Sequence, residues 1–419
     1  MNKATEINRG YLSYLRPPEA SLEQARSLPT KFRAAIASLF SPIMPYVVLL
    51  AIMATSTLVR CYIRLCLWKK VTKLTSVHAG ALDRLDLFLD QYPFHLYPLL
   101  AKSMELAFLQ QQLPKVATAK TKIVELAIGD GSLSKQIYPP EAKITAVDIS
   151  PFSLRFPAEM SHVGRSVISD CLAPAVASGR FDLLVTNNFL HHVSDKEGAL
   201  DHIARIAERS IFNENSIYWA SAWPKPFVLG RLGLRRKETQ EVAAIQARFL
   251  QDLHSRSSLD KMVAERFEIE AEALFLCEKT YFLSNIFARL MGAYGPPTPG
   301  FMKRLAASSP FANRIRSVTR ALAEALIRFD NEQDKTTAVF ISYSCRSRTF
   351  QRTEAATDFI CPDCGTGLAS DLKCTNCGSD FPNLDGMTFL LPKELGFIFS
   401  NYQAQSQDFY EKESLQQHH

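Results

Sequence analysis

The segment from Val124 to Ser132, which reads Val-Glu-Leu-Ala-Ile-Gly-Asp-Gly-Ser, constrains the fold more than any other part of the sequence. An apolar run that leads into a glycine turn predicts a buried strand followed by the start of a helix. A second apolar run ends in Asp148, seventeen residues beyond Gly131. Glycine lets a ligand approach the backbone closely, and an acidic residue at the next strand end accepts hydrogen bonds from ribose hydroxyls. These two strands predict a pocket for an adenosine-bearing cofactor.

The glycine spacing argues against a dinucleotide, because G-x-G-x-x-G requires a third glycine that does not follow Gly129 and Gly131. Glu125 would repel a pyrophosphate and attract an ammonium group. The pattern resembles the first motif of the class I S-adenosylmethionine-dependent methyltransferases, an acidic residue followed by small-x-Gly-x-Gly. The chain departs from that motif at Ala127, where glycine is usual, and we expect a slight loss of fit. An NAD-type or other nucleotide-binding fold is the alternative.

Later segments follow the order of that family. Ser169-Asp170-Cys171 resembles its third motif, and residues 181–195 resemble its fourth strand with the turn that follows. Strands five, six and seven are predicted at residues 216–223, 267–276 and 336–344. The resemblance implies an α/β fold with a doubly wound, seven-stranded methyltransferase sheet and helical lid insertions, preceded by a membrane-associated helix and followed by a small zinc ribbon.

The resemblance also implies roles for single residues. Glu125 would orient the methionine amino group, Asp148 would hold the ribose and Asp170 would reach the adenine. The other predicted cofactor-binding residues lie at the same strand ends: Ala127, Gly129, Asp130, Gly131, Ile149, Cys171, Asn187 and Asn188. Methyl transfer from a sulfonium is an in-line displacement, so such an enzyme mainly aligns the reacting groups.

Two histidines, His191 and His192, follow the predicted fourth strand. One of them is a candidate base for a hydroxyl acceptor, because an unperturbed imidazole titrates near neutrality, and His192 is preferred. The alternative is that both cap or pack the next helix. The run Asn187-Asn-Phe-Leu lacks the Pro-Pro that is common in enzymes that methylate amide or base nitrogens. We therefore expect an oxygen, or a carbon, as the acceptor atom.

The positive charge of the chain is concentrated near its N-terminus. Residues 1–80 hold eleven Lys or Arg and three Glu, whereas the rest of the chain holds 37 basic and 39 acidic residues. Residues 34–59 contain no charged side chain, and such a run can cross a hydrocarbon core of about 30 Å as a helix. We expect a transmembrane, re-entrant or in-plane helix on an anionic membrane, with the catalytic domain facing the cytoplasm. A buried helix is the alternative.

A second strong motif lies near the C-terminus, where C-x2-C-x9-C-x2-C predicts a closed, structural zinc site. Its ligands are Cys361, Cys364, Cys374 and Cys377. Disulfides or a redox pair are the alternatives. The residues that follow, 381–392, resemble zinc ribbons of the Trm112-like type, which activate methyltransferases as separate chains. The resemblance implies a fused ribbon that covers an apolar patch or a sheet edge of the catalytic domain.

The predicted organisation has five parts: a polar lead (1–33), a membrane-associated segment (34–75), the methyltransferase domain (76–347), the zinc ribbon (354–395) and a tail (396–419). Insertions at 224–265 and 280–334 are longer than connections require and are interpreted as lids or docking elements. An apolar stripe within residues 281–294 is either core packing or the wall of a tunnel for a lipid-like substrate.

These features together predict a membrane-associated methyltransferase that acts on a lipid, an isoprenoid or a lipid-linked glycan intermediate. The expected partners are that small-molecule or lipid-linked substrate and an anionic membrane surface. The alternative is a tRNA, rRNA or translation-factor methyltransferase with a fused Trm112-like activator, against which the near-neutral charge beyond residue 80 argues. A third alternative, a cofactor-free scaffold, is opposed by the intact acidic positions.

Overall fold

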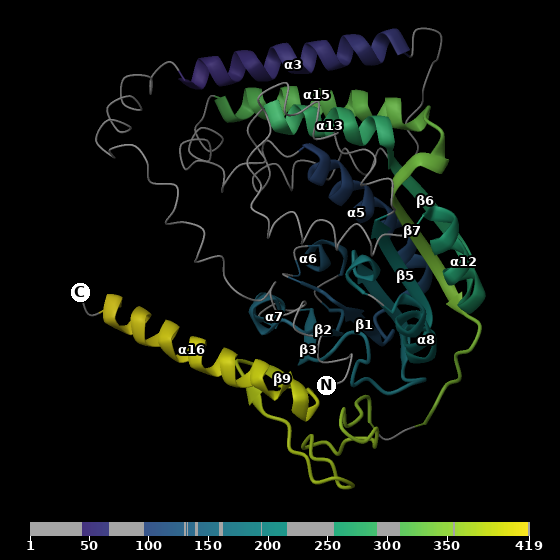
Figure 1. Cartoon of the computed structure of the whole chain (residues 1–419), viewed down its shortest axis with the longest axis vertical. Coiled ribbons are helices and arrows are strands. Elements are labelled where there is room, and N and C mark those ends of the chain that lie inside the picture. The colour runs from purple at the N-terminus through teal and green to yellow at the C-terminus, as the bar shows by residue number, and fades with distance from the viewer. Residues whose placement is uncertain are drawn as a thin grey trace. The chain divides into compact units, whose positions relative to one another are not determined.

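Figure 1 shows a computed structural model of the chain. It describes residues 44–66, 96–129, 131, 133–138, 141–158, 162–193, 195–215, 255–290, 311–354 and 357–417. The chain forms two compact units, Met1–Ala54 and Thr55–His419. Of the first unit, only the start of helix α3 (Met44–Cys66) is described, and the elements that follow α3 belong to the second.

A nine-stranded mixed sheet forms the centre of this unit, in the order β6-β7-β5-β4-β1-β2-β3-β9-β8. Neighbouring strands from β5 through β4, β1, β2 and β3 to β9 are parallel, whereas β7 is antiparallel to β5 and β6, and β8 is antiparallel to β9. The strands are β1 (Ile123–Leu126), β2 (Ile144–Asp148), β3 (Val163–Ile168), β4 (Phe181–Asn187), β5 (Ala207–Asn215), β6 (Phe267–Cys277), β7 (Ala338–Ser347), β8 (Asn383–Leu384) and β9 (Met387–Phe389).

The central strands are buried on both faces, as expected for parallel strands covered by helices. Every residue of β1 and of β2 is buried. Because β1 to β4 are parallel, their carboxyl ends meet at one edge, where ligands bind in doubly wound folds. The predicted α/β methyltransferase-like sheet is confirmed, and two C-terminal strands extend it.

Strand five lies earlier in the chain than predicted. β5 pairs with β4 from Ala207 to Asn213, and the predicted residues 216–223 lie outside the described ranges. The sequence did not indicate a strand at 207–215, because three residues of β5, Ser210, Asn213 and Glu214, are polar although they are almost fully buried. Hydrophobic periodicity does not identify a strand whose buried positions are polar.

Helices cover the sheet, with α8 and α12 on one face and α5 on the other (Figure 1). The helices and 3-10 turns after α3 are α5 (Leu96–Val116), α6 (Ser134–Ile137), α7 (Pro151–Ala158), η3 (Leu190–His192), α8 (Lys196–Ile206), α12 (Arg256–Arg266), α13 (Glu278–Leu290), α15 (Phe311–Asn331), η4 (Lys335–Thr337), η5 (Lys393–Leu395) and α16 (Gly396–Gln417). Helix α6, which follows the glycine turn, is a single turn long.

The insertion predicted at 280–334 contains helices α13 and α15, and residues 291–310 between them lie outside the described part. Both β6 and β5 are antiparallel to β7, so β6 ends at the ligand edge and α13 begins there. Tyr281 of the predicted apolar stripe is fully buried, whereas Phe282 is partly exposed. Of the insertion predicted at 224–265, the structure describes α12 and Ser255 before it.

Helix α3 lies within the segment predicted at 34–75. Among the described residues, no helix has both the length and the apolarity that a membrane crossing requires, and the predicted transmembrane helix is not found. Part of α3 packs against protein instead. Val59 and Ile63 are buried, and the ring of Tyr62 meets that of Phe329 in α15 edge-on, with 6.3 Å between centroids. The predicted polar lead, 1–33, lies outside the described ranges.

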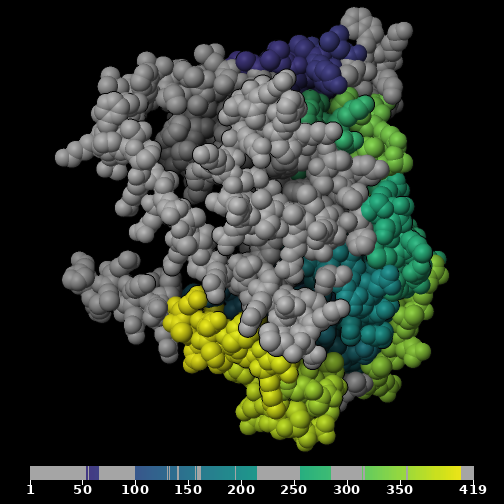
Figure 2. Space-filling model, in the orientation of Figure 1, coloured from purple at the N-terminus to yellow at the C-terminus, as the bar shows by residue number. Residues whose placement is uncertain are grey.

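The C-terminal region completes the sheet and does not form a separate body. Strand β9 pairs with β3 from Ser166↔Met387 to Ile168↔Phe389, and ribbon residues share the continuous core of the catalytic domain. The predicted tail is largely helix α16, whose Tyr402 packs on Phe389 and on Phe152 of α7. Figure 2 shows α16 and the ribbon adjacent on the surface.

Candidate functional site

The loop after β1 has the backbone geometry of a close ligand approach. Ala127, Gly129 and Gly131 all have positive φ values, of 54°, 60° and 65°. Ala127 therefore holds a left-handed conformation that costs a residue with a Cβ about 1 to 2 kcal/mol. A Cβ added to Gly129 would meet no atom within 4 Å, so open space lies over the loop. Asp130 lies outside the described residues.

Glu125 is buried beneath this loop, at the carboxyl end of β1. Its Oε1 accepts hydrogen bonds from Ser134 Oγ at 2.7 Å and from Asn187 Nδ2 at 3.2 Å. Its Oε2 is buried, and no described residue donates to it in good hydrogen-bond geometry, although the Tyr138 hydroxyl lies near the carboxylate. Burial is the largest cause that raises the pKa of Glu125 from 4.5 to about 7. A buried carboxylate oxygen that no described residue satisfies fits a ligand ammonium group.

A chain of buried hydrogen bonds orients Glu125. Asn213 of β5 donates to Asn187 Oδ1, and Ser342 of β7 donates to Asn213 Oδ1. With its oxygen occupied in this way, Asn187 turns its Nδ2 toward Glu125. Sequence reasoning missed Ser134, Asn213 and Ser342. In the sequence, each could have been recognised as a polar residue within a segment that has to be buried, where a polar side chain needs a hydrogen-bond partner.

The two aspartates predicted to bind ribose and adenine lie at the ends of the next strands. Asp148 accepts from the backbone N–H of Gly129 at 2.9 Å and of Ser150 at 2.8 Å. Asp170 accepts from the backbone N–H of Leu172 at 2.9 Å. Burial is the main cause that raises the pKa of both carboxyls. The predicted neighbours Ile149 and Cys171 are both buried. The structure therefore brings Glu125, Asp148 and Asp170 to the ends of three neighbouring parallel strands.

Asn188, the first residue after β4, faces helix α5. It has a φ of 55°, and its Nδ2 donates to Glu105 Oε1 at 3.2 Å. Glu105 is fully buried and also pairs with Lys102 at 3.1 Å. A helix outside the motifs thus contributes a carboxylate to the ligand edge. Glu105 was not predicted from the sequence. It could have been noticed as the single acidic residue in the mostly apolar helix 96–116, because acidic residues are rarely buried without a partner.

The two histidines lie in different surroundings. His191 is buried, and its Nδ1 lies 3.4 Å from Glu214 Oε2, while Glu214 Oε1 accepts the backbone N–H groups of residues 189 and 190. His192 packs its ring on His191, with centroids 4.0 Å apart. Part of His192 is open to solvent, yet desolvation of the ring, with smaller contributions from His191 and Lys196, lowers its pKa to about 3. His192 is therefore a weak base at neutral pH, and the geometry favours His191.

The four predicted metal ligands converge. The sulfurs of Cys361, Cys364, Cys374 and Cys377 all lie within 4.8 Å of one another, with 3.5 Å between Cys361 and Cys377 and 3.4 Å between Cys364 and Cys374. These separations far exceed a disulfide bond. Four thiolates at about 2.3 Å from one zinc ion would lie about 3.8 Å apart, which is compatible with the observed cluster.

The ribbon also braces the loop that follows β3. The backbone N–H of Ile360 donates to Ala175 O at 3.2 Å, and that of Ala177 donates to Asp358 O at 2.9 Å. On the other side, Leu390 N–H donates to Ile168 O at 2.9 Å. Asp170 lies between these anchor points, so the region of the four cysteines supports the predicted adenine site.

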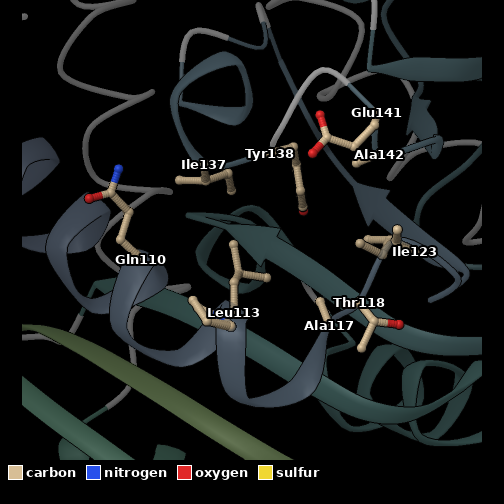
Figure 3. Close-up of a pocket in the computed structure, with 11 residues that line it drawn as sticks. Gln110, Leu113, Ala117, Thr118, Ile123, Ile137, Tyr138, Glu141 and Ala142 are labelled. Atoms are coloured by element: carbon tan, nitrogen blue, oxygen red, sulfur yellow. The ribbon is translucent and has the colours of Figure 1, made fainter.

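A cavity of about 430 Å³ lies beside this site but not within it. It separates the end of α5 from the single turn of α6, and Tyr138 points into it (Figure 3). Its lining includes Ile123, the first residue of β1. The cavity therefore reaches toward the opposite edge of the sheet from the cofactor loop.

A match to one protein family agrees with this geometry. Residues 124–209 match a family described as a methyltransferase domain. No curated protein is a significant match to the chain.

Solved structures with partial similarity include geranyl diphosphate C-methyltransferase from Streptomyces coelicolor A3(2). The two sequences are 15% identical, the match covers 58% of this chain and 77% of that chain, and the TM-score is 0.35. A geranyl diphosphate methyltransferase in complex with SAM has 16% identity, coverage of 64% and 94%, and a TM-score of 0.37. A SAM-dependent methyltransferase from Aquifex aeolicus has 10% identity, coverage of 41% and 85%, and a TM-score of 0.29. Similarity at this level does not identify an acceptor.

The family match covers β1 to β4 and the start of β5, the strands that carry Glu125, Asp148 and Asn187. From this match and the geometry of the glycine turn, the chain contains a class I S-adenosylmethionine-dependent methyltransferase domain and is an S-adenosylmethionine-dependent methyltransferase.

Proposed function

We propose that the protein works at a membrane surface and methylates an oxygen, or a carbon, of a lipid, an isoprenoid or a lipid-linked glycan. The observation that carries the lipid part is the outer face of helix α3. Leu58, Tyr62 and Leu65 are 71%, 48% and 68% exposed and lie at i, i+4 and i+7 on one side of the helix. With Met53, they are four of the eight large apolar side chains exposed in the described part of the chain.

This face has the composition of an in-plane membrane helix. Its inner side, Ser56, Val59 and Ile63, packs on the protein, and the two apolar residues of that side lie roughly 120° around the helix from the outer face. Arg60 and Arg64 lie between those sides, where they can pair with anionic head groups while the leucines enter the acyl region. Leu58 and Leu65 are largely exposed, and Tyr62 is half exposed although its ring also meets that of Phe329. This exposed apolar row supports a lipid surface as its partner.

The residues at the ligand edge fit the cofactor. Bound S-adenosylmethionine supplies an electrophilic methyl group on its sulfonium. Glu125 Oε2, which accepts no well-formed hydrogen bond from the described residues, is proposed to receive the ammonium group, and Asp148 the ribose hydroxyls. Asp170 is proposed to accept from the adenine amino group. All three acids are held by groups of this chain before any ligand arrives, which lowers the cost of ordering them.

His191 is the proposed base for a hydroxyl acceptor. Its contact with Glu214 holds the ring, and in the tautomer with the proton on Nδ1 the basic nitrogen is Nε2. Glu214 in turn accepts two backbone N–H groups, so the carboxylate is fixed by η3 itself. This replaces the initial preference for His192 as the base.

The ribbon is proposed to be a Trm112-like activator fused to its enzyme, with zinc bound by the four cysteines. Support comes from the pairing of β9 with β3, which covers the edge of the sheet as the resemblance implies. The aspartate in the first knuckle, Asp363, accepts from Ser379 Oγ at 2.7 Å and from Lys393 N–H at 3.0 Å. These bonds tie both knuckles and η5 together.

The test combines membrane binding with product analysis. Full-length protein is floated with phosphatidylserine-rich vesicles, and tritiated S-adenosylmethionine is incubated with protein and a membrane lipid extract. We expect label in the organic phase. The Leu58→Ser, Leu65→Ser double variant should lose at least tenfold in vesicle binding, because burial of each leucine contributes about 1.5 to 3 kcal/mol.

Phe397→Ser, which changes an exposed apolar residue of α16, is the matched control and should bind vesicles normally. Label that enters only water-soluble products would refute the lipid acceptor. Equal flotation of the double variant and the wild type would refute the role of α3.

A further inference from the structure

A groove crosses the amino ends of strands β1 to β4. Its lining includes Ile123, Ile144 and Phe181, the first residues of β1, β2 and β4, together with Gly164 near the start of β3. Its volume is about 480 Å³. Since β1 has four residues and a strand rises about 3.3 Å per residue, the groove lies roughly 13 Å from the cofactor edge. It is distinct from the methyltransferase site.

The groove carries an excess of positive charge. Lys120, Lys122, Lys143 and Arg165 line it, with a single carboxylate, Asp358. That carboxylate already pairs with Lys122 at 2.9 Å and with Arg180 at 3.1 Å. The net charge of the residues beyond 80 is near neutral and conceals this local excess of positive charge. A concave surface lined by charges of one sign concentrates the electric field.

A second cavity continues the groove onto the zinc ribbon. It measures about 290 Å³, shares Gly164 and Arg165 with the first, and extends to Ser370, Asn383 and Thr388. Arg165 is held at the junction, where its guanidinium lies 5.3 Å from the ring centroid of Phe359. The two cavities form one elongated strip from the catalytic domain to the ribbon, and we call it the basic groove.

We propose that the basic groove binds the sugar–phosphate backbone of a single-stranded RNA. Its concave shape excludes a flat bilayer, and its two parts, of about 480 and 290 Å³, hold more than one phosphate would fill. Clustered cations supply affinity for successive phosphates, while hydroxyl and amide side chains such as Ser370 and Asn383 contact backbone oxygens in nucleic-acid complexes. The inference concerns binding alone and does not depend on the proposed acceptor.

The experiment measures fluorescence anisotropy of a labelled, mixed-sequence, single-stranded RNA with the full-length, zinc-loaded chain over a range of salt. The test variant reverses three charges, Lys120→Glu, Lys143→Glu and Arg165→Glu. We expect its salt slope, log K against log salt, to be shallower by about 2, since each single-strand phosphate contact contributes about 0.7. Affinity at low salt should fall at least tenfold.

The matched control reverses three exposed charges on helices away from the groove: Lys261→Glu, Lys279→Glu and Arg328→Glu. It changes the net charge equally and should keep the wild-type slope. Calorimetric affinity for S-adenosylmethionine should be unchanged in both variants, which shows that they are folded. An equal loss in both variants, or no RNA binding by the wild type, would overturn the proposal. Equal competition by poly-glutamate would assign the groove to an acidic protein instead.

Discussion

Replacing Glu125 with Gln should stabilise the unliganded protein and weaken cofactor binding. Burial raises the pKa of Glu125 from 4.5 to about 7, so between these values the folded state holds a proton that the unfolded state has released. Stability from this group is therefore highest below pH 4.5 and is lost as pH rises through 7. This rise in the pKa of Glu125, from 4.5 to about 7, corresponds to about 3 kcal/mol at higher pH. Glutamine cannot ionise and avoids this loss.

Cofactor binding should change in the opposite sense. An ammonium group prefers the ionised carboxylate, whose fraction rises from about 9% at pH 6 to about 91% at pH 8 for a pKa of about 7. The affinity of the wild type for S-adenosylmethionine should therefore rise about tenfold over that range. The Gln variant should bind at least tenfold more weakly at pH 8, with no comparable rise.

The assay is urea unfolding at pH 5 and pH 8, together with titration calorimetry from pH 6 to pH 8. Glu268→Gln, which changes an exposed carboxyl of β6, is the control and should alter neither measurement. An equal gain in the free energy of unfolding at both pH values would show that Glu125 does not ionise in the folded protein with the expected cost. A Gln variant that keeps the wild-type pH dependence of binding would show that Glu125 does not receive the ammonium group.

Three further predictions follow from other parts of the site. Ala127→Gly should raise the free energy of unfolding by up to about 1 kcal/mol in urea titration, because it relieves a left-handed alanine, whereas Ala264→Gly on α12 should lower it by about as much. Cys374→Ser should release zinc, which mass spectrometry of the metal would detect, and lower the melting temperature in a thermal scan. It should also weaken S-adenosylmethionine binding at least tenfold, measured by calorimetry. Zinc loss with unchanged affinity would contradict the bracing of the Asp170 loop. His191→Ala should reduce methyl transfer to lipid oxygen about 100-fold with unchanged cofactor affinity, and His192→Ala less than tenfold, by tritium incorporation. Equal losses would remove the distinction between the two histidines.

Local sequence signals were sufficient for the main parts of the pocket. The turn after Glu125 was predictable because glycines after an apolar run permit positive φ, and Gly129 and Gly131 have it. Asp148 was predictable because parallel strands present their carboxyl ends at one edge. The convergence of the four cysteines was predictable because their knuckle spacing already limits where four sulfurs can lie. Each of these inferences uses residues that are close together along the chain.

Only the tertiary structure could show how the pocket is held. The orientation of Asn187 depends on Asn213 and Ser342, which belong to other strands and become its neighbours only after β4, β5 and β7 have paired. The preference for His191 depends on a carboxylate 23 residues later in the chain. The pairing of β9 with β3, and the basic groove that results, join segments about 200 residues apart. Side-chain packing and strand register determine contacts of this kind, and neither produces a periodic pattern in the sequence.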